Sequence, residues 1–171
     1  EGGAAITLNV NGADLKILND LSIGSGATFA HVDAADTIRI GGNWTNSGNF
    51  TEGTGTVLFD GTSGTSTITT LGTGDPFYHV RFVADGATYE LGSDVGIDGT
   101  LTLDSGIFST GGSSYDIYSS GDWDVNAGGT FEPQLGTVFF DNTGAQNIAG
   151  FTFNNFSTTG TGTKTLSQGC E

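Results

Sequence analysis

Apolar and polar residues alternate over short stretches along most of the chain, and small turn-forming residues separate these stretches. A period of two places successive side chains on opposite faces of a strand, so each stretch predicts a β-strand. Windows with apolar residues three and four apart, which indicate helices, are nearly absent. The pattern predicts an all-β chain with strands over Ile6–Val10, Thr28–Val32, Thr37–Ile40, Thr56–Phe59, Tyr78–Val83, Thr88–Leu91, Thr100–Leu103, Tyr115–Tyr118, Thr137–Phe140 and Phe151–Phe156.

The residues between these strands are those that make tight turns. Asn11-Gly12, Asp60-Gly61, Asp85-Gly86 and Asp98-Gly99 each combine a residue that tolerates positive φ with one that adopts it freely. The strands are therefore expected to be short and spaced about eight residues apart.

An internal repeat is the strongest pattern in the sequence. Gly42-Asn43-Trp44 recurs as Gly121-Asp122-Trp123, and Gly55–Thr62 recurs as Gly136–Thr143. A partial third copy follows, and residues 151–166 also resemble residues 3–18. We expect a single domain with repeats of approximately 3–76 and 77–150 and a stub at 151–171.

Two architectures are compatible with such a repeat. One is a parallel β-solenoid with about three short strands per coil, and the alternative is a pair of small antiparallel β-sandwiches. Even spacing, short Gly-rich turns and the absence of long crossovers favour the solenoid. About seven coils, stacked at about 4.8 Å, would make a rod on the order of 35 Å long.

Composition then excludes several classes of protein. The 171 residues carry 19 acidic and 4 basic side chains, a formal net charge of −15. A surface with so few Lys and Arg residues does not suit a nucleic acid or an anionic membrane. No apolar run approaches the roughly 20 residues of a membrane-spanning helix, and the single Cys170 excludes a disulfide scaffold.

Three strings carry a resemblance to a known type of repeat: residues 42–51, 55–62 and 99–106. They resemble the tandem β-helix repeats of large exported bacterial and archaeal cell-surface proteins of the adhesin-like type. The resemblance covers most of the chain and implies an extracellular setting at the cell surface, with adhesive or matrix roles. It implies no catalytic residues.

Candidate chemistry is sparse. Clustered carboxylates with a basic residue or a metal would indicate a polysaccharide-active enzyme, but the carboxylates here are scattered through turns, so we expect no enzyme. His31 and His79 lack partners at zinc-ligand spacing. Calcium is the one candidate cofactor, and its candidate ligands are Asp94, Asp98, Asp122 and Asp124, although no EF-hand loop or calcium nonapeptide is present.

Other residues have a structural and a functional interpretation. Trp44 and Trp123 are either packing residues, which we favour, or aromatic platforms that contact glycans. Cys170 is a candidate for an intermolecular disulfide or a free thiol. Three sites match the N-glycosylation acceptor pattern, namely Asn43, Asn49 and Asn155.

The ends of a solenoid raise a separate question, because an end coil exposes unpaired backbone groups and an apolar cross-section. The sequence predicts no amphipathic helix and no charged cap at either end. The chain is therefore either an excerpt of a longer array or a subunit that pairs head-to-tail with identical copies. Pairing would use the terminal strands, through Ile6, Leu8, Val10, Phe151, Phe153, Phe156 and Leu166.

These observations lead to one main hypothesis and one alternative. The chain is expected to be a non-enzymatic structural subunit of an extracellular filament or surface matrix, a homopolymer whose assembly depends on salt or divalent cations. The alternative is a stalk or glycan-binding segment of a cell-surface adhesin. Neither hypothesis includes a nucleic-acid partner or insertion into a membrane.

Overall fold

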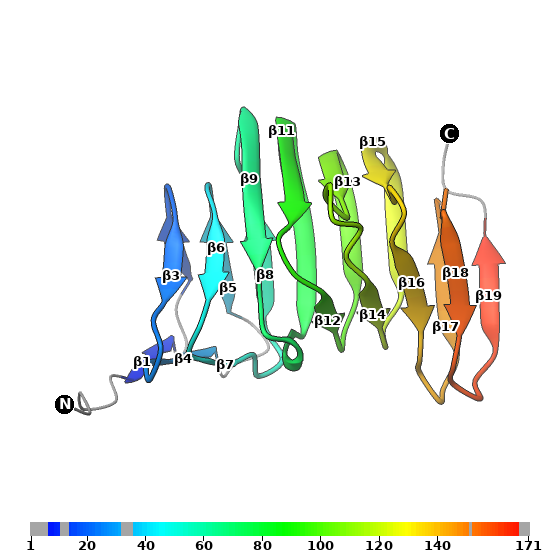
Figure 1. The fold of residues 1–171 in the computed structure, drawn as a ribbon, viewed down its shortest axis with the longest axis horizontal. Helices are drawn as coiled ribbons and strands as arrows, with labels where there is room; N and C mark the ends of the chain where they lie inside the picture. The colour runs from blue at the N-terminus through cyan, green and yellow to red at the C-terminus, as the bar shows by residue number, and fades with distance from the viewer. Residues whose placement is uncertain (1–6, 11–13, 32–35, 151, 168–171) are drawn as a thin grey trace.

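The computed structural model describes residues 7–10, 14–31, 36–150 and 152–167. Within them the chain is all-β and winds as a parallel β-solenoid of about seven turns. Figure 1 shows the coils following one another along the longest axis, with the first and the last coil at opposite ends. Every described strand pair is parallel, so the solenoid prediction is confirmed and the alternative of two antiparallel sandwiches is wrong.

Each coil begins on a first face of the solenoid, which is built from two sheets in succession. The first, three-stranded sheet comprises β1 (Thr7–Val10), β4 (Thr28–His31) and β7 (Asn49–Thr51). The five-stranded sheet that follows comprises β10 (Gly72–Phe77), β12 (Val95–Ile97), β14 (Ile117–Ser119), β16 (Thr137–Phe140) and β18 (Asn155–Thr158).

The eleven-stranded sheet forms the other two faces. The second face runs through β2 (Leu15–Ile17), β5 (Thr37–Ile40), β8 (Thr56–Phe59), β11 (His79–Leu91), β13 (Leu101–Ser109), β15 (Trp123–Glu132), β17 (Gln146–Ala149) and β19 (Lys164–Ser167). The third face comprises β3 (Leu21–Ile23), β6 (Trp44–Asn46) and β9 (Gly64–Thr69), followed by the later parts of β11, β13 and β15.

Glycine bends the long strands instead of ending them. Gly86 (φ 82°) lies inside β11 and Gly106 (φ 86°) inside β13. This left-handed conformation costs glycine little, and it turns each strand from the second face onto the third. Asp85-Gly86, predicted as a turn between two strands, is therefore a corner within one strand.

The interior is built from ladders of apolar side chains that continue from coil to coil. One ladder on the second face runs in register through Leu15, Ile38, Val57, Val80, Leu101, Trp123, Ile148 and Leu166. Its six central members are at most 3% exposed. Phe82 stacks between Phe59 and Phe108 with ring centroids 5.2 and 4.6 Å apart. Close-packed burial of this kind is the dominant favourable term in folding.

The internal repeat does not coincide with whole turns. Trp44 pairs with Ile68 on the third face, whereas its repeat equivalent Trp123 pairs with Leu101 on the second face. Successive members of the ladder from Val57 to Trp123 are 21 to 23 residues apart. The 79 residues between the tryptophans thus fall between three and four turns, and equivalent residues occupy different faces.

Candidate functional site

Acidic side chains at the corners bind the backbone of the following coil. Asp14 Oδ1 accepts the Thr37 N–H at 2.9 Å, Asp116 Oδ1 accepts that of Thr137 at 2.8 Å, and Asp122 Oδ1 accepts that of Asn147 at 2.7 Å. A carboxylate that accepts a backbone N–H makes a charge-assisted bond. The many turn carboxylates therefore join neighbouring coils.

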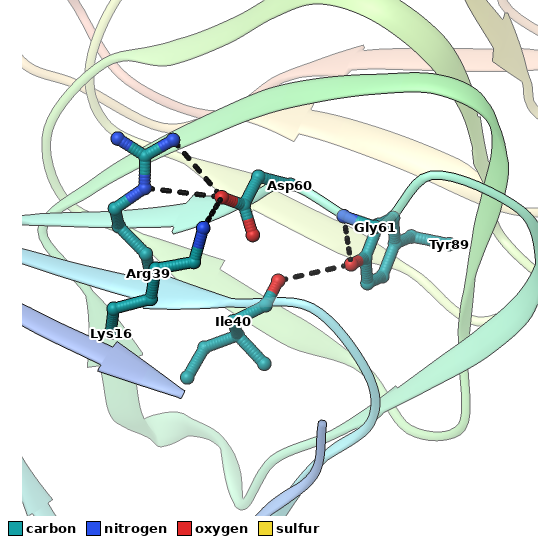
Figure 2. A network of polar contacts seen from close by, with 6 residues as sticks. All are labelled: Lys16, Arg39, Ile40, Asp60, Gly61 and Tyr89. Atoms are coloured by element: carbon teal, nitrogen blue, oxygen red, sulfur yellow. Dashed lines mark hydrogen bonds and ion pairs between the residues drawn. The ribbon is translucent and has the colours of Figure 1, made fainter. Parts of the chain in front are cut away.

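Three basic side chains on the second face form ion pairs with nearby aspartates. Asp60 at the end of β8 lies 3.6 Å from Lys16 Nζ and 3.0 Å from the Arg39 guanidinium, as Figure 2 shows. Arg81 pairs with Asp104 at 2.6 Å. The basic partners are about half exposed, so each pair contributes about 0–1 kcal/mol. The second face therefore offers no unpaired cluster of these cations to a ligand.

Tyr89 connects three coils from inside the solenoid. Its hydroxyl donates to the Ile40 carbonyl at 3.1 Å and accepts the Gly61 N–H at 3.0 Å (Figure 2). The side chain is fully buried and packs against the rings of Phe59 and Phe82. Burial, opposed in part by the bond from Gly61, raises the pKa of this phenol. Both hydrogen bonds of the hydroxyl are made to the backbone of earlier coils.

The two histidines occupy separate structural positions. His79 Nδ1 accepts the Thr100 N–H at 2.9 Å, the role that Asp and Asn side chains have at other corners. His31 Nε2 lies 3.0 Å from the Asp36 carbonyl and therefore donates to it. Burial lowers the pKa of both imidazoles, so both are neutral near pH 7. They lie in different sheets, His31 on β4 and His79 on β11.

The four calcium candidates do not converge. Asp94 and Asp98 flank β12 on the first face, whereas Asp122 and Asp124 lie at the start of β15 on the second. Asp94 and Asp122 already accept backbone N–H groups of the next coil. Within the described part of the chain, no three Asp, Glu, His or Cys side chains gather as metal ligands do. The structure therefore does not bring these four carboxylates together.

The two tryptophans lie inside the solenoid. Trp44 and Trp123 are each 1% exposed. Trp44 packs edge-on against Phe50 and Phe77, and Trp123 does the same against Phe131 and other phenylalanines. Both rings act as packing residues, and the alternative of glycan platforms at these positions is wrong because a sugar cannot reach them.

The three candidate glycosylation sites differ in accessibility. Asn49 and Asn155 are exposed. Asn43 is only partly exposed, because its amide donates to Asp20 Oδ1 at 3.0 Å and its carbonyl oxygen accepts the Thr67 N–H at 2.7 Å. Cys170 lies outside the described residues. Asn49 and Asn155 therefore stay as candidates for modification.

The residues predicted for self-assembly gather at the two end coils, as far as the structure describes them. Leu166 on β19 and Phe156 on β18 are 58% and 43% exposed, and Phe153 packs partly buried against the core. Leu8 and Val10 lie in β1, in register with Phe29 and His31. Ile6 and Phe151 lie outside the described residues.

Two surface features were not anticipated from the sequence. Leu18, which follows β2 in the first coil, is 72% exposed. Tyr118 and Phe139 stack on the outer surface of the first face, with centroids 4.9 Å apart and ring planes 6° apart. Each ring stands between two buried neighbours and therefore points away from the core. The parallel pairing of β14 with β16 then places the two rings side by side.

Comparison with family models, with curated proteins and with solved structures finds no match. No described helix is long and apolar enough to cross a membrane.

Proposed function

We propose that the chain is a non-enzymatic structural subunit of an extracellular filament or surface matrix, which assembles head-to-tail through its end coils. The observation that carries the proposal is the state of those coils. The apolar ladder of the second face continues to Leu166, and this side chain is more than half exposed although Ile148, one coil earlier, is fully buried.

The backbone at the two ends supports the same proposal. Of the described strands, β2 and β19 are the last members at opposite ends of their sheet path, and β1 and β18 are edge strands of the first face. Each edge strand presents a row of N–H and C=O groups that an added parallel strand can pair with. Because the ends differ, pairing of one end with the other generates an open filament unless the rotation closes a ring.

The side chains at the ends would contribute to such a junction. Full burial of one large apolar side chain is worth about 1.5–3 kcal/mol, and Leu18, Phe156 and Leu166 are already partly out of water. Together they would stabilise a junction by roughly 3–4 kcal/mol. The net charge of −15 opposes association of copies, so screening by salt or divalent cations is expected to promote assembly.

The proposal is tested with two exposed leucines, one on the last coil and one between β15 and β16. Leu166→Asp puts a charge on the last coil, and Leu135→Asp puts the same charge on a 72% exposed side chain between β15 and β16. Sedimentation against protein and salt concentration should show assembly in the wild type and in Leu135→Asp, and its loss in Leu166→Asp. Equal assembly of all three proteins, or none in the wild type under any condition, would refute the proposal.

The adhesin-stalk alternative shares the rod but needs no self-assembly. The close joining of coils by ladders and corner carboxylates supports a rigid spacer equally well. Dispersed monomers that bind a glycan would favour this alternative.

A further inference from the structure

A grid of outward side chains covers the first face at β12, β14 and β16, the strands of the fifth, sixth and seventh coils. Tyr118 and Phe139 form the central column; they point outward because each stands between fully buried neighbours in β14 and β16. Alternation along a strand places the second residue before and after each ring on the same outer surface. These flanking positions hold Asp116, Ser120, Thr137 and Asp141.

The fifth coil extends the grid with two more carboxylates. Asp94 and Asp98 flank Gly96, which pairs with Tyr118. A side chain at Gly96 would touch Pro76 and Thr73 of β10, at 3.1 and 3.2 Å. Residues 73–76 bulge over this glycine, because Gly72 pairs with Val95 and Phe77 with Ile97. The stacked rings therefore lie between this bulge and the small Ser157, which pairs with Phe139 on the last coil.

The carboxylates retain free acceptor capacity. Asp94 Oδ1 accepts the Asp116 N–H, Asp116 Oδ1 accepts the Thr137 N–H, and Asp141 Oδ1 accepts the Ser120 hydroxyl. The second oxygen of each of these carboxylates has no partner among the described residues. Burial and then the charges of Asp116 and Asp94 raise the pKa of the Tyr118 phenol. The negative charges of Asp94 and Asp116 therefore lie near the Tyr118 ring.

The charge of this surface selects its ligand. Residues 82–163 contain no Lys or Arg, so no cation of these coils neutralises the four carboxylates of the grid. The π-face of an aromatic ring attracts apolar C–H groups and cations, and the parallel stack of Tyr118 and Phe139 leaves one face of each ring free of the other. Carboxylates without a cationic partner attract ammonium groups. An acidic glycan would be repelled.

We infer that the outer surface of the first face, centred on Tyr118 and Phe139 and bordered by Asp94, Asp98, Asp116 and Asp141, binds a glycan that carries protonated amino sugars. The sugar rings would pack against the two aromatic rings, and the ammonium groups would bind the carboxylates on either side. This inference does not depend on the proposed assembly, because the grid lies on the side of the rod and not at its ends.

The test compares fully deacetylated glucosamine oligomers with N-acetylglucosamine oligomers of equal length, by calorimetry at a pH that keeps the amines protonated. The wild type should bind the deacetylated oligomer about tenfold more tightly, and salt should weaken this binding. Asp94→Asn/Asp116→Asn removes both charges but keeps each Oδ1 acceptor, and should reduce affinity about tenfold. Tyr118→Ser/Phe139→Ser should reduce it by a similar factor.

The matched control is Asp14→Asn/Asp122→Asn, which removes two other corner charges that also accept backbone N–H groups. It should leave affinity within about twofold of the wild type. Equal loss in both pairs of variants, no binding by the wild type, or binding of an oligolysine peptide without binding of the glucosamine oligomer would each overturn the inference. Loss of binding with assembly intact would leave the proposed function standing.

Discussion

Removing the Tyr89 hydroxyl tests how strongly polar contacts join the coils. Tyr89→Phe keeps the ring, which packs 4.9 Å from Phe59, and removes only an oxygen that bonds Gly61 and Ile40. The Gly61 N–H then loses this acceptor in the buried interior, whereas the Ile40 carbonyl still accepts the Asp60 N–H at 3.0 Å. A buried polar group that loses its partner costs about 1–3 kcal/mol, so the variant should lose about 1–3 kcal/mol of unfolding free energy.

Urea unfolding followed by circular dichroism and tryptophan fluorescence measures this loss. With a slope of about 2 kcal/mol per molar urea, the midpoint should fall by about 0.5–1.5 M. Solenoids unfold as coupled coils with nearest-neighbour interfaces, and Tyr89 links the fourth coil to the second and third. Trp44 in the second coil should therefore report a larger shift than Trp123 in the sixth, when each is monitored in a variant that lacks the other.

Tyr118→Phe is the control, because no described residue hydrogen-bonds the hydroxyl of this outward tyrosine. It should change stability by less than about 0.5 kcal/mol. If Tyr89→Phe behaves like Tyr118→Phe, the hydroxyl bonds contribute nothing net and the reasoning about coil linkage fails.

Three further outcomes follow from individual contacts. Burial lowers the pKa of His79 and of His31 in the folded chain. The neutral imidazoles therefore contribute fully to folding stability above the ordinary pKa of about 6.5, and this contribution declines as pH falls toward the lower folded pKa. The urea midpoint should accordingly drop between pH 7.5 and 5. His79→Asn, whose Oδ1 can replace Nδ1 as acceptor for Thr100, should reduce that drop, and an unchanged pH dependence would contradict the assignment. In Gly106→Ala the new methyl group clashes with the Ala84 carbonyl and the residue also has an unfavourable positive φ, so the variant should lose about 3 kcal/mol or more of stability. Gly64→Ala has a similar positive φ but open space around the methyl group, and should lose about 1 kcal/mol. Similar urea midpoints for the two variants would refute the close contact at Gly106. Arg81→Gln removes an exposed pair with Asp104 and should shift stability by less than about 1 kcal/mol, an effect that 1 M NaCl abolishes; a larger, salt-insensitive loss would show that the pair is not screened.

The fold class could be predicted because the local signals agree along the whole chain. Period-two alternation, short Gly-rich turns and recurring Phe and Val positions all indicate short, evenly spaced strands in equivalent coils. The prediction of about seven coils is confirmed. The polar alternation at Thr37–Ile40 and Thr56–Phe59 even gave the strand boundaries that β5 and β8 have.

The arrangement of faces could not be predicted in the same way. A repeat of 79 residues indicates equivalent local structure, but only the length of each coil decides on which face a residue lies, and coil length varies with the corners. Asp85-Gly86 has the sequence of a turn, yet a left-handed glycine also bends a continuous strand. Tyr118 and Phe139, 21 residues apart in the sequence, become neighbours only through the register of β14 and β16.

Electron microscopy of the wild-type chain at high protein concentration and physiological salt tests the central claim most directly. Head-to-tail pairing through the end coils predicts unbranched threads with an axial repeat of roughly 35–40 Å, the height of one subunit's stacked coils at about 4.8 Å each. Isolated rods of that length, with no threads at any concentration at which the chain stays folded, would contradict it.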